Sequence, residues 1–89
     1  MATSENPKVF MMVAAGKALD YRTINPSASS NEIMQFVVNG VEAEGSAKIG
    51  AIAAADRAIK YKEQNPRSSD KEIMQRIMNE TPEILEALE

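Results

Sequence analysis

The sequence predicts an all-α protein, a four-helix domain built from two tandem, pseudo-repeated helical hairpins plus a short C-terminal helix. Two observations carry this prediction: an internal repeat with a period of 40 residues, and helix start and stop signals in both copies of that repeat. Residues 6–39 align without a gap to residues 46–79. The residues of the first copy that recur unchanged in the second are Lys8, Ala14, Ala15, Ala18, Tyr21, Asn25, Pro26, Ser29, Glu32, Ile33, Met34, Gln35 and Asn39.

These identities number 13 in 34 aligned positions, whereas unrelated segments of this composition share roughly two or three. The repeat is therefore a property of the chain and not of its composition. Two copies are too few for a solenoid, because such arrays need about three or more repeats to bury a continuous core. A single pseudo-symmetric domain over residues 1–89 is the better prediction.

The first helix of each hairpin has clear ends. Asn6 followed by Pro7 is typical of a helix start, since Asn caps the helix and proline needs no backbone partner at the first position. Ser46 occupies the equivalent cap position in the second copy. Asn25-Pro26 and Asn65-Pro66 end these helices after about 18 residues, because proline pushes the preceding residue out of the α region.

The second helix of each hairpin opens with a capping box, in which a serine and a glutamate three residues later satisfy each other's backbone N–H groups. The pairs are Ser29 with Glu32 and Ser69 with Glu72. The linker between the hairpins is residues 40–45, with a glycine at each end. As a hinge it would let the hairpins exchange between protomers, and the sequence leaves this arrangement and an antiparallel bundle both open. Thr81-Pro82-Glu83 predicts the start of a separate, acidic C-terminal helix over residues 82–89.

Composition narrows the function classes. The 89 residues include no Cys and no His, so disulfides and the commonest metal ligand are absent. The longest apolar run, residues 9–15, is far shorter than the roughly 20 residues that cross a bilayer. No phosphate loop, metal cluster or activated nucleophile is recognisable. We expect a non-enzymatic cytoplasmic protein without a catalytic residue, metal or cofactor, and with no membrane contact.

The two copies differ in how apolar they are, and this difference predicts a protein interface. Where the second copy has Gly50, Ala51, Ala53 and Arg76, the first has larger apolar residues. An apolar surface all around a helix must be buried on more than one side. We expect contact with another chain, most simply a homodimer. The expected interface residues are Phe10, Met11, Val13, Phe36 and Val41. The alternative is that the first helix lies centrally in the monomer and Phe36 covers the edge of the core.

A second functional hypothesis is a small DNA-binding transcriptional regulator. Residues 46–79 carry seven basic and four acidic side chains, although the whole chain has a net charge of −3. In this hypothesis one helix of the second hairpin would contact nucleic acid through Lys71, Gln75, Arg76 and Asn79. Asp70 and Glu72 lie where that helix would approach phosphate, which disfavours the hypothesis.

The run Ala58-Ile59-Lys60-Tyr61, leading to Asn65-Pro66, resembles the end of a tetratricopeptide-repeat hairpin. The resemblance covers about ten residues in each copy, and the period of 40 differs from the 34 residues of such repeats. The bulky aromatic residue and the Leu-Gly pair of their first helix have no counterpart here. The resemblance implies a helical scaffold that binds protein, and no binding residue is carried over from it.

Overall fold

The computed structural model describes residues 6–88, and these form four α-helices without a strand. The helices are α1 (Pro7–Ile24), α2 (Ser30–Gly40), α3 (Gly45–Gln64) and α4 (Asp70–Ala87). The all-α prediction and its four helices are confirmed. None of the helices in this part of the chain is both long enough and apolar enough to cross a membrane.

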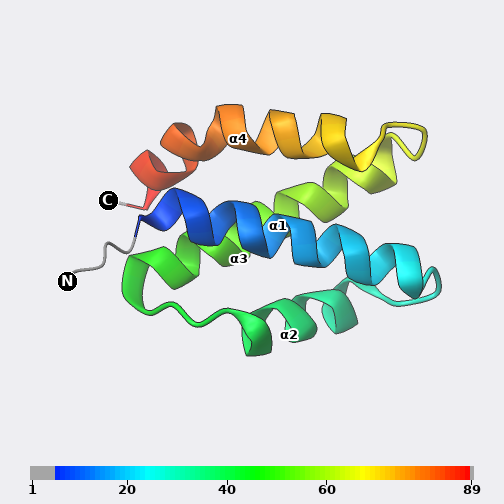
Figure 1. Cartoon of the computed structure of the whole chain (residues 1–89), viewed down its shortest axis with the longest axis horizontal. Coiled ribbons are helices and arrows are strands. Elements are labelled where there is room, and N and C mark those ends of the chain that lie inside the picture. The colour runs from blue at the N-terminus through cyan, green and yellow to red at the C-terminus, as the bar shows by residue number, and fades with distance from the viewer. Residues whose placement is uncertain (1–5, 89) are drawn as a thin grey trace.

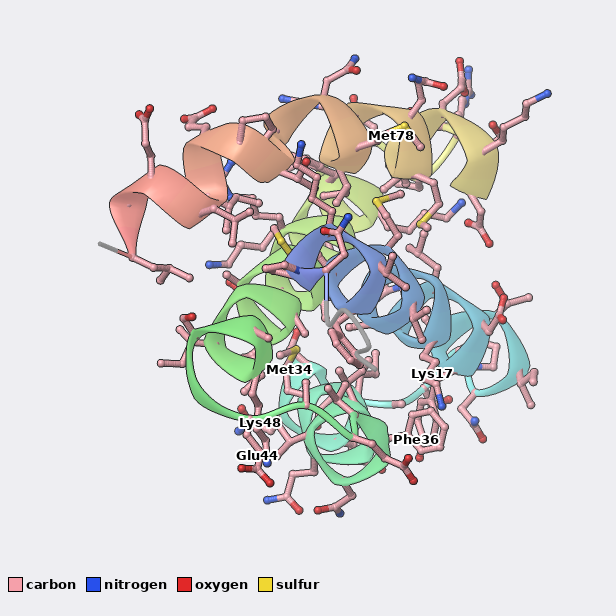
Figure 2. All side chains as sticks on the ribbon, turned by 60° about the vertical axis from the view of Figure 1, so that its left-hand side comes forward. Lys17, Met34, Phe36, Glu44, Lys48 and Met78 are labelled. Carbon is pink, nitrogen blue, oxygen red and sulfur yellow. The ribbon has the colours of Figure 1, made fainter. Side chains whose placement is uncertain are left out.

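The helices pack in three layers. α1 and α3 lie against each other in the middle and run in one general direction, while α2 and α4 return in the other (Figure 1). α2 covers one side of the central pair and α4 the other (Figure 2). Each outer helix contacts both central helices, and the outer helices do not contact each other. The central pair therefore needs small side chains where its two helices meet and apolar side chains on both outer sides.

Alanine supplies the small side chains of the central pair. Ala14, Ala15 and Ala18 of α1 are fully buried, as are four alanines of α3, Ala51, Ala54, Ala55 and Ala58. Larger side chains then form two clusters, one on each side of the pair. Ile33 and Val37 of α2 pack into the first cluster with Ile59. The second cluster contains Met11, Leu19, Ile73, Ile77 and Ile84.

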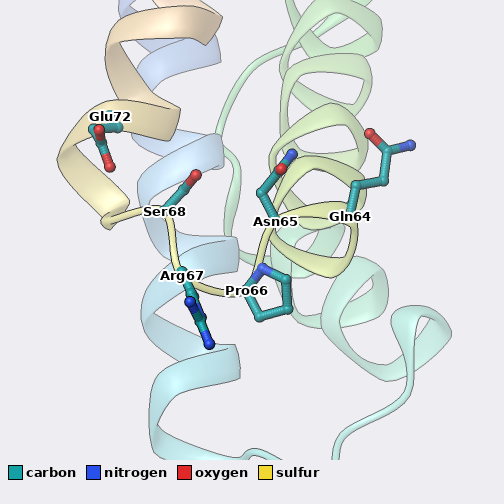
Figure 3. Close-up of a pocket in the computed structure, with 6 residues that line it drawn as sticks. All are labelled: Gln64, Asn65, Pro66, Arg67, Ser68 and Glu72. Carbon is teal, nitrogen blue, oxygen red and sulfur yellow. The ribbon is translucent and has the colours of Figure 1, made fainter.

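The helix ends follow the local sequence at most positions. Asn6 Oδ1 accepts a hydrogen bond from the Lys8 backbone N–H at 3.0 Å. Both capping boxes are formed, with Ser29 Oγ and Ser69 Oγ each 3.1 Å from the backbone nitrogen of the glutamate three residues later. α1 ends before Asn25, and α3 ends before Asn65, at the turn drawn in Figure 3. These predicted boundaries are confirmed.

The start of α3 differs from the prediction. Ser46 does not cap this helix, since α3 begins one residue earlier, at Gly45, and Glu44 is the N-cap residue without a side-chain hydrogen bond. The reason is the backbone of Gly45, whose φ of 63° is accessible to glycine and turns the chain into the helix before Ser46. The linker that would act as a hinge is packed against the core. Val41 and Ala43 are buried while Glu42 and Glu44 are exposed, and this alternation is typical of an extended segment.

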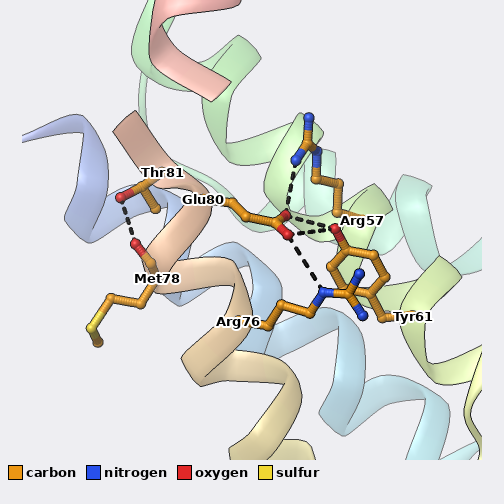
Figure 4. Close-up of polar contacts among 6 residues, drawn as sticks. All are labelled: Arg57, Tyr61, Arg76, Met78, Glu80 and Thr81. Atoms are coloured by element: carbon orange, nitrogen blue, oxygen red, sulfur yellow. Dashed lines mark hydrogen bonds and ion pairs between the residues drawn. The ribbon is translucent and has the colours of Figure 1, made fainter. Parts of the chain in front are cut away.

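The predicted separate C-terminal helix is wrong, because α4 continues through Pro82 to Ala87. Proline lacks the N–H that would donate to the carbonyl of Met78, four residues earlier. The hydroxyl of Thr81 donates to that carbonyl instead, at 2.9 Å (Figure 4). Thr81 is buried, and this hydrogen bond gives its hydroxyl and the Met78 carbonyl a partner each. This hydrogen bond explains how the helix tolerates the proline.

We expect Thr81→Val to lower the free energy of unfolding by about 1–2 kcal/mol, because it keeps the shape of the side chain and leaves the Met78 carbonyl without its donor. Urea unfolding followed by circular dichroism measures this change. In a Pro82→Ala background the backbone N–H returns, and the cost of Thr81→Val should shrink. An unchanged cost in that background would contradict the proposed compensation.

Candidate protein-interaction surface

A group of apolar side chains lies exposed where α1 and α2 meet. Val9 and Val13, one helical turn apart on α1, are 57% and 47% exposed, and Phe36 of α2 is 43% exposed. Phe36 is visible beside Lys17 at the lower edge of Figure 2, on the side of α2 nearest to α1. We call Val9, Phe10, Val13 and Phe36 the α1/α2 surface. Ile24, Ile49 and Met78 are also exposed and come from other parts of the helices.

A shallow groove adjoins this surface and runs between α1 and the chain that leaves α2. Its lining residues are Val9, Phe10, Val13, Lys17, Gly40, Val41 and Glu42. The groove brings together three of the five predicted interface residues, namely Phe10, Val13 and Val41. It also contains one positive and one negative side chain, Lys17 and Glu42, which form no ion pair with each other or with any other of residues 6–88.

Two of the five predicted interface residues belong to the core. Met11 is fully buried against α3 and α4, and Val41 is 9% exposed and packs under α2. Met11 lies over Gly50, where its Sδ is 3.4 Å from the position that a Cβ would take. Helical spacing placed Met11 correctly on an apolar face, which α4 covers, whereas Val41 lies in the extended linker beyond the end of α2. Neither residue can be counted as an exposed contact.

Phe36 has two roles in the structure. Its ring packs on Tyr21 of α1, with ring centroids 4.6 Å apart and planes tilted by 36°. The remaining exposed part of the ring faces solvent. Phe36 therefore covers the edge of the α1/α2 contact, as the monomeric alternative expected, and also contributes to the α1/α2 surface.

A polar network lies between α3 and α4, and the repeat and helical periodicity do not predict it. Glu80 of α4 accepts hydrogen bonds from the Tyr61 hydroxyl, at 2.7 and 2.8 Å from its two carboxylate oxygens, and from Arg57 Nη1 at 2.8 Å (Figure 4). Arg76 lies over the Tyr61 ring, 3.8 Å from the centroid, and its Nε is 3.5 Å from the same carboxylate. The helical spacing of Arg76 and Glu80 was the available signal in the sequence.

The network changes the acidity of its members. Partial burial alone would raise the pKa of the Glu80 carboxyl, but hydrogen bonds from Tyr61 and Arg57, with the charges of Arg57 and Arg76, together lower it by more, so the net pKa lies below its usual value. Burial, followed by the bond to Glu80, raises the pKa of Tyr61. The hydrogen bond to Glu80 also raises the pKa of Arg57. The network between α3 and α4 thus favours the ionised form of the carboxylate.

Glu80→Gln is expected to lower the free energy of unfolding by about 1–2 kcal/mol at pH 7, since it removes the charge from a 19% exposed side chain that has two hydrogen-bond donors and two ion pairs. A lowered folded-state pKa stabilises the fold above the ordinary value of 4.5, and this contribution disappears as the pH falls through the folded-state pKa. The difference between the two proteins should therefore shrink toward pH 3. Exposed Glu83→Gln is the control and should change stability little at either pH.

The residues of the nucleic-acid hypothesis lie on α4 but do not form a basic surface. Lys71, Gln75 and Asn79 are exposed, while Arg76 is held against Tyr61 and Glu80. α4 carries only two basic residues, and its five acidic residues are Asp70, Glu72, Glu80, Glu83 and Glu86. A phosphate backbone would meet net negative charge along this helix. The geometry does not favour nucleic acid as a partner.

Two further hollows lie at the turns that join α1 to α2 and α3 to α4. The second is lined by Gln64, Asn65, Pro66, Arg67, Ser68 and Glu72 (Figure 3). The first is lined by the corresponding Asn-Pro turn and Glu32. The Glu72 carboxylate already accepts from the Ser69 backbone N–H at 2.9 Å, as its capping role requires. Both hollows thus follow from the turn geometry, and neither places a nucleophile beside a base.

Within residues 6–88 no three acidic side chains gather in a way that would hold a metal ion. The chain matches no protein-family model, no curated protein and no solved structure. Among the features described above, the α1/α2 surface is the one that most clearly suggests a function.

Proposed function

We propose that this chain is a small, non-enzymatic protein-interaction module of the cytoplasm that self-associates through the α1/α2 surface. The exposure of Val9 and Val13 beside the groove, with Phe36 exposed further along the contact between α1 and α2, carries the proposal. Single exposed apolar residues are normal on proteins, but a group of them beside a groove is typical of an interface. An isologous dimer is the simplest assembly, because a two-fold axis lets the same face bury itself.

The fold supports this choice of face. We also infer that the molecule consists of two equivalent hairpins, since residues 40 positions apart occupy corresponding places in the two core clusters. Ile33 and Val37 pack against one side of the central pair, and Ile73 and Ile77 pack against the other. The outer surfaces then differ by a few substitutions. Phe36 stands where α4 has Arg76, so the first hairpin presents an apolar side chain where the second presents a charged one.

The size of the surface sets the expected strength of association. Burying several hundred Å² of apolar area at about 25 cal/mol per Å² supplies several kcal/mol. Association costs on the order of 4–15 kcal/mol in lost rigid-body freedom, so only part of this remains. We therefore expect a weak, concentration-dependent dimer, with a dissociation constant roughly between micromolar and millimolar.

Light scattering coupled to size-exclusion chromatography tests the proposal. The mass should rise from 9.7 kDa toward twice that value as the protein concentration is raised. Val13→Glu should hold the protein as a monomer with unchanged helix content, because this 47% exposed position admits a charge in the monomer. Met78→Glu is the matched control, since Met78 is 51% exposed and lies on α4, on the opposite side of the molecule (Figure 2).

The control variant should associate like the unaltered protein. A wild-type mass of 9.7 kDa at every concentration would overturn self-association. Equal loss of the dimer in Val13→Glu and Met78→Glu would overturn the choice of the α1/α2 surface, because the two variants carry the same chemical change on opposite faces.

A further inference from the structure

The polar network of the second hairpin has an incomplete counterpart in the first. Arg57, Tyr61 and Glu80 form the network around one carboxylate. The residues 40 positions earlier are Lys17, Tyr21 and Gly40. The cation and the tyrosine are thus present on α1 at helical spacing, while the position that carries the carboxylate on α4 is a glycine on α2.

The groups that would hold a carboxylate are free at this incomplete site. Among residues 6–88, Lys17 has no ion-pair partner and the Tyr21 hydroxyl has no hydrogen-bond partner. Lys17 Nζ lies 3.5 Å from the position that a Cβ on Gly40 would take. The ammonium group therefore lies directly over the residue that corresponds to Glu80. Figure 2 shows Lys17 reaching toward Phe36, one turn before Gly40 on α2.

We propose that Lys17 and Tyr21 form a receptor for a carboxylate, and that Glu42 of a second molecule of this chain supplies it. The inference rests on the proposed self-association and names the polar contact that orients it. Glu42 is exposed, lines the same groove as Lys17, and has no ion-pair partner among residues 6–88. A two-fold axis that sets groove against groove makes every contact twice, so opposite charges in one groove are self-complementary.

The receptor can be tested inside one molecule by restoring the missing carboxylate. A side chain at Gly40 meets nothing closer than the flexible end of Lys17, and the φ of Gly40 is negative, so substitution is sterically permitted. Gly40→Glu is compared with Gly40→Gln, in the presence of Lys17 and in a Lys17→Met background. Glutamate at a helix C-terminus is disfavoured by the helix dipole, and the Lys17→Met background measures that cost alone.

The measured quantity is the unfolding midpoint temperature of Gly40→Glu minus that of Gly40→Gln. This difference should be higher by roughly 2–4 °C when Lys17 is present than in the Lys17→Met background. The Glu variant should also dimerise at least tenfold more weakly than the Gln variant, because its own carboxylate occupies the receptor. Equal relative stabilities in the two backgrounds would overturn the receptor, whatever the oligomeric state of the protein.

The identity of the donor is tested by exchanging charges between molecules. Lys17→Glu and Glu42→Lys should each weaken the homodimer at least tenfold, because each places like charges opposite one another twice. A one-to-one mixture of the two variants should form a heterodimer, since every Glu at position 17 then faces a Lys at position 42. The double variant Lys17→Glu/Glu42→Lys should dimerise like the unaltered protein.

These outcomes separate the receptor from the proposed function. If Val13→Glu abolishes the dimer and the charge exchange restores nothing, the α1/α2 surface remains the interface and Glu42 is not the donor. If the unaltered protein never dimerises, both the self-association and a donor on a second molecule are excluded. Sedimentation velocity on the single variants, their mixture and the double variant at low salt distinguishes the cases, and 1 M salt should reduce the differences among them.

Discussion

Met11→Ala is expected to lower the free energy of unfolding by about 2–5 kcal/mol, as truncation of a large, fully buried side chain does elsewhere. Met11 has no exposed surface and fills the space over Gly50, where the chain has no side chain of its own. Leu85 of α4 reaches the same space. The alanine variant would leave a cavity where α1, α3 and the end of α4 meet. Since an 89-residue domain has a total stability of roughly 4–13 kcal/mol, this loss is a large fraction of it.

Urea unfolding at low protein concentration measures the effect on the monomer. Met12→Ala is the matched control, because Met12 is the same residue type in the same turn of α1 but only partly buried. Its cost should be below about 1 kcal/mol. Similar costs for both variants would show that Met11 is not the core residue described above. A Met11→Ala protein that keeps its stability but loses only self-association would return Met11 to the interface.

The placement of Met11 shows what helical periodicity can and cannot predict. The spacing of apolar residues in α1 indicated that more than one side of the helix is buried, and the structure agrees. Periodicity does not identify which neighbour covers each side. α4 covers Met11 within the same molecule, whereas Val13, two residues later, has no covering helix. Choosing between core and interface thus required the positions of the other helices.

Local chemistry predicted most helix ends, because the groups involved lie within a few residues of one another. Both capping boxes and both Asn-Pro stops are of this kind. The prediction failed at Pro82, where the rule that proline ends a helix competes with a hydroxyl that replaces the lost donor. Thr81 immediately before the proline was the available signal. The same Thr81-Pro82-Glu83 sequence is also typical of a helix start, so it predicts the wrong structure at this position.

The Glu80 network was missed for a different reason. Its members come from two helices, and Arg57 and Glu80 are separated by 23 residues. The aligned part of the two repeats ends one residue before Gly40 and Glu80, so the repeat does not point to Glu80. Only the packing of α4 on α3 brings the carboxylate to Tyr61. Once this packing is known, Gly40 beside Lys17 can be recognised as the corresponding position, which has no side chain to supply a carboxylate.

Ala14→Leu and Ala54→Leu are each expected to lower the free energy of unfolding by about 1–3 kcal/mol, and their combination is expected to remove a large fraction of the protein's stability. Both alanines are fully buried between the helices, and they occupy corresponding positions in the two repeats. Adding a branched side chain at either position forces α1 and α3 apart, and both core clusters depend on that contact.

Thermal unfolding by circular dichroism compares the two single variants, the double variant and an exposed control, Asp20→Leu of α1. If the hairpins are equivalent units, the two single variants should cost the same within about 1 kcal/mol, because their neighbours correspond. A large cost at one position and none at the other would contradict that equivalence. Because the receptor beside Lys17 is inferred from the same correspondence, this comparison also tests the structural premise on which the receptor depends.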